Sequence, residues 1–181
     1  QRQMCIRDSL MAAAHADAVH GAEICRDLQD RLVMIARVSD AGAFVNTNAL
    51  TLKRSHGDYS VMQLLYDGSE IKAVLDFVNA GEVPIAWELI RSYSYMDCTF
   101  NAARLAAYTN EYRRYAEVSM DDLRYMPYLY LGQLLSSTYG YKQYLQTGDE
   151  ELLAFGRWRT EMCRSLIANA GEVSAELVRL A

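Results

Sequence analysis

The chain contains few of the residues that hold metal clusters or disulfide frameworks. Its 181 residues include four cysteines, three histidines and two prolines. The cysteines are widely spaced and form no Cys-x-x-Cys pair; they are Cys5, Cys25, Cys98 and Cys163. With so few histidines, this spacing excludes the common zinc-binding patterns, and scattered thiols of this kind are typical of buried apolar positions.

Long apolar runs and an excess of positive charge are also absent. No segment approaches the roughly 20 apolar residues of a membrane helix, and residues 1–9 lack the charged-then-apolar order of a secretory leader. The formal net charge of −5 argues against a nucleic-acid surface, which usually needs clustered lysine and arginine. We therefore expect a cytoplasmic protein that binds neither a membrane nor a nucleic acid.

What remains is an ordinary globular composition, in which hydrophobic residues make up 51% of the chain. A chain of this length can form one domain with a sizeable core, or one lobe of a larger protein. Residues 1–9 read Gln-Arg-Gln-Met-Cys-Ile-Arg-Asp-Ser, which resembles the translation of sequencing-adapter DNA. We expect this segment to be non-native and the natural protein to begin further upstream.

The hydrophobic pattern predicts helices with a small strand region between them. Residues 11–38 place apolar side chains at helical spacing, as one long helix or two short ones. Residues 39–48 predict a loop and residues 50–55 a short extended run. Two β-prone runs, 63–66 and 71–75, flank the turn dipeptide Asp67-Gly68 and predict a hairpin. After Pro84 the pattern predicts helices over residues 85–95, 100–117, 120–139, 150–169 and 172–180, with Gly140, Gly148 and Gly171 as breaks between the later ones.

Two aspartates occupy special places in this layout. Asp58 follows His56-Gly57 in the loop after the extended run, and Asp76 ends the second strand of the hairpin. Because a hairpin brings its outer ends together, we expect residues 58–63 and Asp76 to lie close in space. Oxygen-bearing side chains in such a place suit Mg²⁺ bound to nucleotide phosphates.

The spacing matches what phosphoryl transfer requires. One carboxylate orients and deprotonates the attacking hydroxyl, while another carboxylate with an amide partner holds Mg²⁺ against the phosphates. Protein kinases place the base and the amide in His-Arg-Asp-x-x-x-x-Asn and supply a second metal ligand from a downstream Asp-Phe-Gly. Here Gln63 follows Asp58 by five positions, and Asp76-Phe77 stands at the end of the hairpin.

Residues 55–89 resemble the catalytic segment of the aminoglycoside phosphotransferase/choline kinase family. That family reads His-Gly-Asp-x-x-x-x-Asn, then a strand-turn-strand, Ile-Asp-Phe/Trp, a small-residue loop, a proline and an acidic residue before leucine. The resemblance covers roughly residues 50–144, because the downstream helices are similar to the helical substrate-binding part of the same lobe. It implies an α+β, mostly helical fold of the protein-kinase type, in which residues 10–181 form the C-terminal catalytic lobe without the nucleotide-binding lobe.

The resemblance also implies an activity and a set of site residues. The activity is ATP-dependent phosphoryl transfer to a hydroxyl of a small molecule, with Mg²⁺ as cofactor. Asp58 would be the catalytic base, Gln63 and Asp76 would be Mg²⁺ ligands, and His56 and Glu88 would support the loop. Gln63 and Glu88 stand where the family usually has asparagine and aspartate. Because no glycine-rich phosphate loop and no strand lysine with a helix glutamate partner precede the motif, we expect the 181-residue chain alone to be inactive.

Other interpretations of these residues stay open. A kinase-like lobe altered at Gln63 and Glu88 could be a catalytically inactive binding module. Metal-dependent hydrolysis by Asp58 and Asp76 is disfavoured, because no further histidine or aspartate ligands accompany them. Eleven of the thirteen tyrosines lie between Tyr93 and Tyr144; some could form an aromatic cage for a quaternary ammonium, although tyrosines at helical spacing are more often packing residues.

Overall fold

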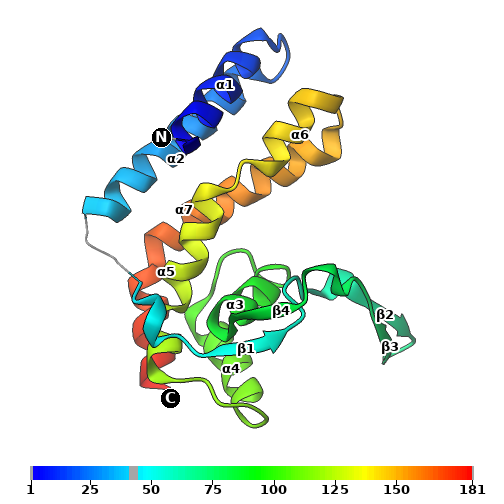
Figure 1. Cartoon of the computed structure of the whole chain (residues 1–181), viewed down its shortest axis with the longest axis vertical. Helices are drawn as coiled ribbons and strands as arrows, with labels where there is room; N and C mark the ends of the chain where they lie inside the picture. Colours follow the sequence, from blue (N-terminus) through cyan, green and yellow to red (C-terminus); the bar gives the residue numbers. More distant parts are fainter. Residues whose placement is uncertain (1, 41–44, 181) are drawn as a thin grey trace. The chain divides into compact units, whose positions relative to one another are not determined.

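The computed structural model describes residues 2–40 and 45–180, most of which are helical (Figure 1). Contacts divide the chain into two compact units. Unit 1 comprises Gln1–Phe44 and Leu131–Ile167, and unit 2 comprises Val45–Tyr130 and Ala168–Ala181. The prediction of a mostly helical chain with a small strand region is confirmed. None of the helices in the described part combines the length and apolar character that crossing a membrane requires.

The first two helices of unit 1 are α1 (Arg2–Ala16) and α2 (Gly21–Asp40). Of the two alternatives predicted for residues 11–38, two helices is therefore correct. The break between them is a turn in which Asp17 Oδ1 accepts hydrogen bonds from the backbone N–H groups of Val19 and His20, at 3.0 and 2.7 Å. Aspartate favours such turns because its short side chain bonds the backbone two or three residues on.

Three further helices follow near the end of the chain: α5 (Met120–Ser136), α6 (Tyr139–Thr147) and α7 (Glu150–Arg179). The glycine breaks predicted here were partly wrong. Gly148 ends α6 with φ +72°, but Gly140 lies inside α6 and Gly171 inside α7, which is one continuous helix. A Cβ at Gly140 would lie 2.5 Å from the backbone nitrogen of Gly156, so this glycine permits close packing of α6 on α7.

The interior of unit 1 combines an apolar cluster with paired charges. The buried cluster includes Leu10, Ala14, Ile24, Leu28, Tyr141 and Leu153. Beside it, Asp27 accepts hydrogen bonds from the Tyr141 hydroxyl and from Arg164 Nη2, the latter at 2.8 Å. Arg31 donates from Nε to Thr160 Oγ1 at 3.0 Å. Buried charges of this kind are tolerated when they are paired and hydrogen-bonded.

Unit 2 carries the strands, in two antiparallel pairs. β1 (Leu52–Ser55) pairs with β4 (Gly81–Pro84), and β2 (Leu64–Asp67) pairs with β3 (Glu70–Val74). β1 and the hairpin confirm the predictions from the sequence, whereas β4 was not predicted. Ser55 is the partner of Gly81, so the loop that follows β1 and the loop that precedes β4 leave the same end of this sheet.

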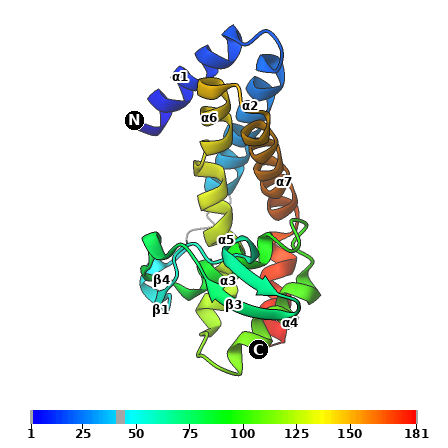
Figure 2. The same cartoon turned by 90° about the vertical axis from the view of Figure 1, so that its right-hand side faces the viewer.

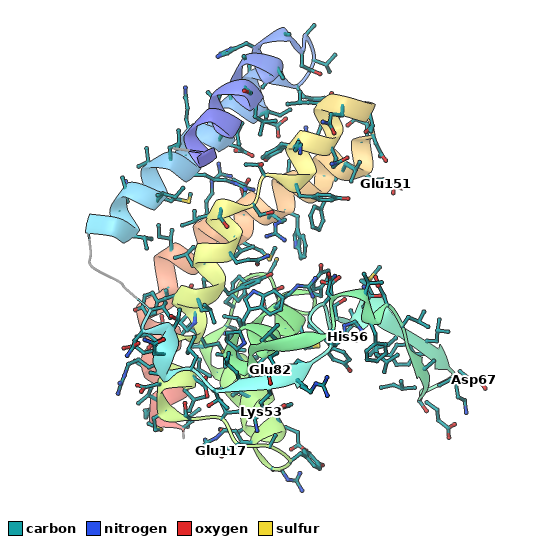
Figure 3. All side chains as sticks on the ribbon, in the orientation of Figure 1. Lys53, His56, Asp67, Glu82, Glu117 and Glu151 are labelled. Atoms are coloured by element: carbon teal, nitrogen blue, oxygen red, sulfur yellow. The ribbon has the colours of Figure 1, made fainter. Side chains whose placement is uncertain are left out.

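The hairpin of β2 and β3 extends away from the rest of unit 2. Figure 3 labels His56 near the base of the hairpin and Asp67 at its tip. Large apolar side chains on it are exposed, among them Leu65, Tyr66 and Ile71, each with more than half of its surface accessible.

Helix α3 (Ile85–Ser94) contacts β1, β4 and α4 (Ala102–Arg113), as Figures 1 and 2 show. Both helices fall within the predicted ranges. The start of α5 is capped by Ser119 and Asp122, whose side chains bond each other's backbone N–H at 3.0 and 2.9 Å. Asp122 also accepts a hydrogen bond from Thr51 N at 2.9 Å, which attaches the chain just before β1 to this helix.

Candidate active site

The loop that follows β1, residues 56–59, is fixed first by His56. The His56 side chain is buried, and its Nε2 lies 2.6 Å from the carbonyl oxygen of Leu75. Nε2 therefore carries the proton, since a carbonyl only accepts. Nδ1 in turn accepts a hydrogen bond from the backbone N–H of Asp58 at 3.3 Å. The imidazole thus links the 56–59 loop to the residue that precedes Asp76.

Gly57 gives this loop its sharp path. Its φ is +77°, a region that side-chain-bearing residues rarely adopt. A Cβ at Gly57 would lie 2.0 Å from the carbonyl oxygen of Asn79. The glycine therefore serves two purposes, because it provides the left-handed turn and lets the loop that precedes β4 approach.

Helix α3 holds the backbone of the 56–59 loop through Glu88. The two carboxylate oxygens accept hydrogen bonds from Gly57 N at 3.0 Å and Tyr59 N at 2.8 Å. Glu88 is buried, with 7% of its surface accessible, and hydrogen bonds from backbone N–H groups are what a buried carboxylate needs. The predicted bracing role of Glu88 is consistent with these two contacts.

One helical turn further along, Arg91 contacts the same loop. Its Nη2 forms an ion pair with Asp58 Oδ1, and its Nη1 donates to Tyr59 O at 3.1 Å. The guanidinium carbon lies 5.7 Å from the ring centroid of Trp87 and 5.4 Å from that of Tyr95. Arg91 is not among the site residues predicted from the sequence. A signal was present, because Trp87, Arg91 and Tyr95 recur every four residues and so share one helix face.

The predicted metal ligands lie on the segment that contains Leu75, which His56 bonds, and on the 3₁₀ turn that follows the loop. Asp76 precedes a short 3₁₀ turn, Phe77–Asn79, and has φ 61° and ψ 61°. Its side chain is exposed and makes no capping hydrogen bond, although aspartate at this position usually caps. Aspartate tolerates this left-handed region better than most residues with a side chain, and non-glycine residues in this conformation concentrate at functional sites.

Gln63 is half-buried and ends a second 3₁₀ turn, Val61–Gln63. Its carbonyl oxygen accepts a hydrogen bond from Leu75 N at 2.8 Å. The backbones of Gln63 and of the residue before Asp76 are therefore adjacent, as expected from the closure of the hairpin. That the Gln63 amide and the Asp76 carboxylate bind one ion stays a prediction. Over residues 2–40 and 45–180, no three or more His, Cys, Asp or Glu side chains gather as a metal site.

A pocket of about 410 Å³ adjoins the 56–59 loop at His56 and Tyr59. Tyr108 and Tyr112 of α4 and Glu88 of α3 also line it. Burial raises the pKa of Tyr59, Tyr108 and Tyr112, and the charge of Glu88 adds to the rise at Tyr112. These hydroxyls are therefore neutral hydrogen-bonding groups at neutral pH. Of the tyrosines considered for a cation cage, Tyr108 and Tyr112 line this pocket, whereas Tyr115 is exposed.

A family model of phosphotransferase enzymes matches residues 11–118, more than half of the chain. The matched range contains the 56–59 loop, the hairpin, Asp76 and helix α3. The chain belongs to the phosphotransferase enzyme family. No curated protein and no solved structure gives a significant match. The family resemblance identified from the sequence is therefore confirmed. Members of this family are phosphotransferases, and the family implies a kinase-like fold for the region that carries the 56–59 loop and the Asp76 turn.

Proposed function

We propose that the protein transfers the γ-phosphoryl group of ATP to a hydroxyl of a small molecule, with Asp58 as the catalytic base. The support is the loop itself. Glu88 and Arg91 of α3 bond the 56–59 loop, His56 ties the loop to Leu75, and the Asp58 side chain stays 27% accessible. A carboxylate that is fixed on one side and open on the other can orient an incoming hydroxyl.

In the proposed reaction, the acceptor oxygen attacks the γ-phosphorus. A new oxygen–phosphorus bond forms, the bond between the γ-phosphorus and the bridging oxygen breaks, and ADP leaves. The hydroxyl proton passes to the Asp58 carboxylate. Because phosphoryl transfer proceeds through a loose transition state, the main work of the protein is to position the reactants and to stabilise charge.

The side chains of Gln63 and Asp76 fit a magnesium ion. Mg²⁺ prefers oxygen ligands, keeps several waters and is usually held by one or two carboxylates together with substrate phosphates. The Asp76 carboxylate is exposed and without a capping bond, so it is available for that purpose. When bound, Mg²⁺ would neutralise charge on the phosphates. The proposal includes the expectation that this catalytic lobe works with a nucleotide-binding lobe.

The test is phosphoryl transfer by the complete product of the gene that encodes this chain. Purified protein is incubated with Mg²⁺ and ATP and with aminoglycosides, macrolides, choline and homoserine, and phosphorylated product is measured. Asp58→Asn is expected to lower kcat on an accepted substrate by ~10²–10⁴-fold. Asp76→Asn should remove Mg²⁺-dependent nucleotide binding, whereas Asp67→Asn at the hairpin tip serves as the matched control and should change neither. Absence of ATP consumption with every alcohol would count against the proposal.

A catalytically inactive binding module is the second candidate. It is favoured by Gln63 and Glu88, which differ in length from the usual family residues. In that case the protein would bind Mg²⁺-nucleotide with equal affinity before and after Asp76→Ala, and no product would form. Calorimetric titration of the two proteins distinguishes this candidate from the enzyme, for which Asp76→Ala should weaken binding.

A further inference from the structure

Arg91 is a charged residue beside Asp58 to which the proposed reaction assigns no role. Its side chain is only 12% accessible, and it approaches the 56–59 loop from helix α3. One nitrogen pairs with Asp58 Oδ1 and another donates to Tyr59 O at 3.1 Å. The guanidinium therefore contacts the proposed base and the backbone of the next residue at the same time.

The guanidinium is itself held in place. Trp87 and Tyr95 lie one helical turn before and after Arg91, with their ring centroids 5.7 and 5.4 Å from its central carbon. Nη2 also lies 3.4 Å from the Tyr95 hydroxyl. Cation–π contacts and a planar fork of donors leave Arg91 little rotational freedom. A rigid arginine in turn restricts rotation of the carboxylate that it contacts.

We propose that Arg91 is a positioning residue that fixes Asp58 Oδ1, so that Oδ2 faces the acceptor hydroxyl. The recorded ion pair engages Oδ1, and the Asp58 side chain keeps 27% accessibility. Glu88 fixes the loop backbone through Gly57 N and Tyr59 N, and Arg91 fixes the side chain at the loop tip. Glu88 and Arg91, three residues apart on α3, together set both the path of the loop and the direction of the base.

A cation next to a base has two opposite effects. It orients the carboxylate, but it also stabilises the ionised form and so weakens the affinity for the proton. In a loose phosphoryl transfer the new oxygen–phosphorus bond is only partly formed in the transition state, so a small loss of basicity costs little, whereas a misplacement of ~1 Å can cost ~10²-fold in rate. Orientation therefore outweighs the loss of basicity, and Arg91 should raise the rate of transfer.

The inference rests on the proposed function, and it is tested with Arg91→Ala and Arg91→Lys in the complete gene product. For Arg91→Ala we expect kcat for transfer to fall ~10–100-fold, with KM for ATP unchanged within twofold. Hydrolysis of ATP by water needs no oriented acceptor, so the ratio of hydrolysis to transfer should rise. Lysine keeps the charge but cannot contact Asp58 and Tyr59 O with one planar fork, so Arg91→Lys should stay at least fivefold below the parent in kcat.

The matched control is Arg157→Ala, which removes an arginine that pairs with Glu23 in unit 1 through hydrogen bonds of 2.6 Å. It should leave kcat and the hydrolysis ratio unchanged, and circular dichroism shows which variants are folded. If folded Arg91→Ala retains full kcat, or if transfer and hydrolysis fall by the same factor, the positioning role is wrong. If instead Asp58→Asn retains activity, the proposed base is wrong, and the failure lies with the proposed function.

Discussion

Units 1 and 2 both bury charged side chains, but they use them differently. In unit 1, Asp27 and Arg31 of α2 bond side chains of α6 and α7, namely Tyr141, Thr160 and Arg164. In unit 2, Glu88 and Arg91 of α3 bond the backbone of a loop and one carboxylate at its tip. The first set joins helix to helix, whereas the second joins a helix to a loop.

The two sets also differ in how completely they bond the carboxylate at their centre, Asp27 in unit 1 and Asp58 in unit 2. Asp27 is 8% accessible and is bonded on both carboxylate oxygens, Oδ1 by Arg164 and Oδ2 by Tyr141. Asp58 is bonded through Oδ1, and its side chain keeps 27% accessibility. A carboxylate satisfied on both oxygens contributes to stability, while one left partly open is available for chemistry. Substitutions in the two sets should therefore separate loss of stability from loss of activity.

The largest expected effect on stability is that of Asp27→Ala. The change removes the buried acceptor that Tyr141 and Arg164 share. Arg164 is 35% accessible and keeps Asp30 and Glu161 as partners, so the expected cost is that of the lost buried hydrogen bonds, ~1–3 kcal/mol. Denaturant unfolding measures the loss, with Asp30→Ala as the matched control. Asp30 pairs with the same arginine but is 51% accessible, so its removal should cost at most ~1 kcal/mol. Equal losses in the two variants would contradict the structural role given to Asp27.

Gly57→Ala should have a smaller effect on stability and a large one on activity. A side chain at φ +77° costs about 1–2 kcal/mol, and the new Cβ would also collide with Asn79 O, 2.0 Å away. The loop must then move, and kcat should fall by at least ~10²-fold. Gly68→Ala is the control, because Gly68 has φ +59° but open space around it. Should both variants keep the parent kcat, the close approach at Gly57 has no role in catalysis.

The smallest effect is expected from acid on the Glu23–Arg157 pair. Hydrogen bonds from Arg157 hold the pKa of Glu23 below its ordinary value of 4.5. Because the pKa is depressed in the folded state, the stabilisation is present above pH 4.5 and is lost as the pH falls through the lower folded value. Both side chains are about one third accessible, so the contribution should not exceed ~1 kcal/mol.

Denaturant unfolding of the parent and of Glu23→Gln at about pH 6 and about pH 3 measures this contribution. The parent should be the more stable protein at the higher pH, and the difference should shrink at the lower pH. Glu151→Gln, at an exposed position of α7, is the control and should show no such change. A gap between parent and Glu23→Gln that is independent of pH would contradict the assignment.

The sequence predicted the parts of the fold that depend on local pattern. Asp67-Gly68 between two β-prone runs predicted the hairpin, and apolar spacing predicted most helices. β4 was missed because Gly81 and Pro84 are both unusual in strands, and its pairing with β1 is set by contacts far along the chain. The prediction of a break at Gly140 was wrong because it also depended on local pattern alone. Only the packing of α6 on Gly156 shows that this glycine is needed inside a helix.

In the candidate site, too, features set by local spacing were predicted and features set by tertiary packing were not. The motif spacing predicted that the segments carrying Asp58, Gln63 and Asp76 approach one another, and the bonds of Leu75 to His56 and Gln63 agree with that. Arg91 was not predicted, because its spacing with Trp87 and Tyr95 places the three side chains on one helix face without showing what that face contacts. Its role depends on the direction in which α3 faces the loop, and that is fixed only by tertiary packing.

The left-handed backbone at Asp76 restricts which variants can be used to study it. Of the common residues, glycine, asparagine and aspartate tolerate this conformation best. Asn is therefore the replacement that removes the negative charge while keeping the turn, and Ala changes both at once. In a saturation library screened for folding alone, position 76 should retain Asp, Asn and Gly, and among these three a screen for phosphoryl transfer should keep Asp.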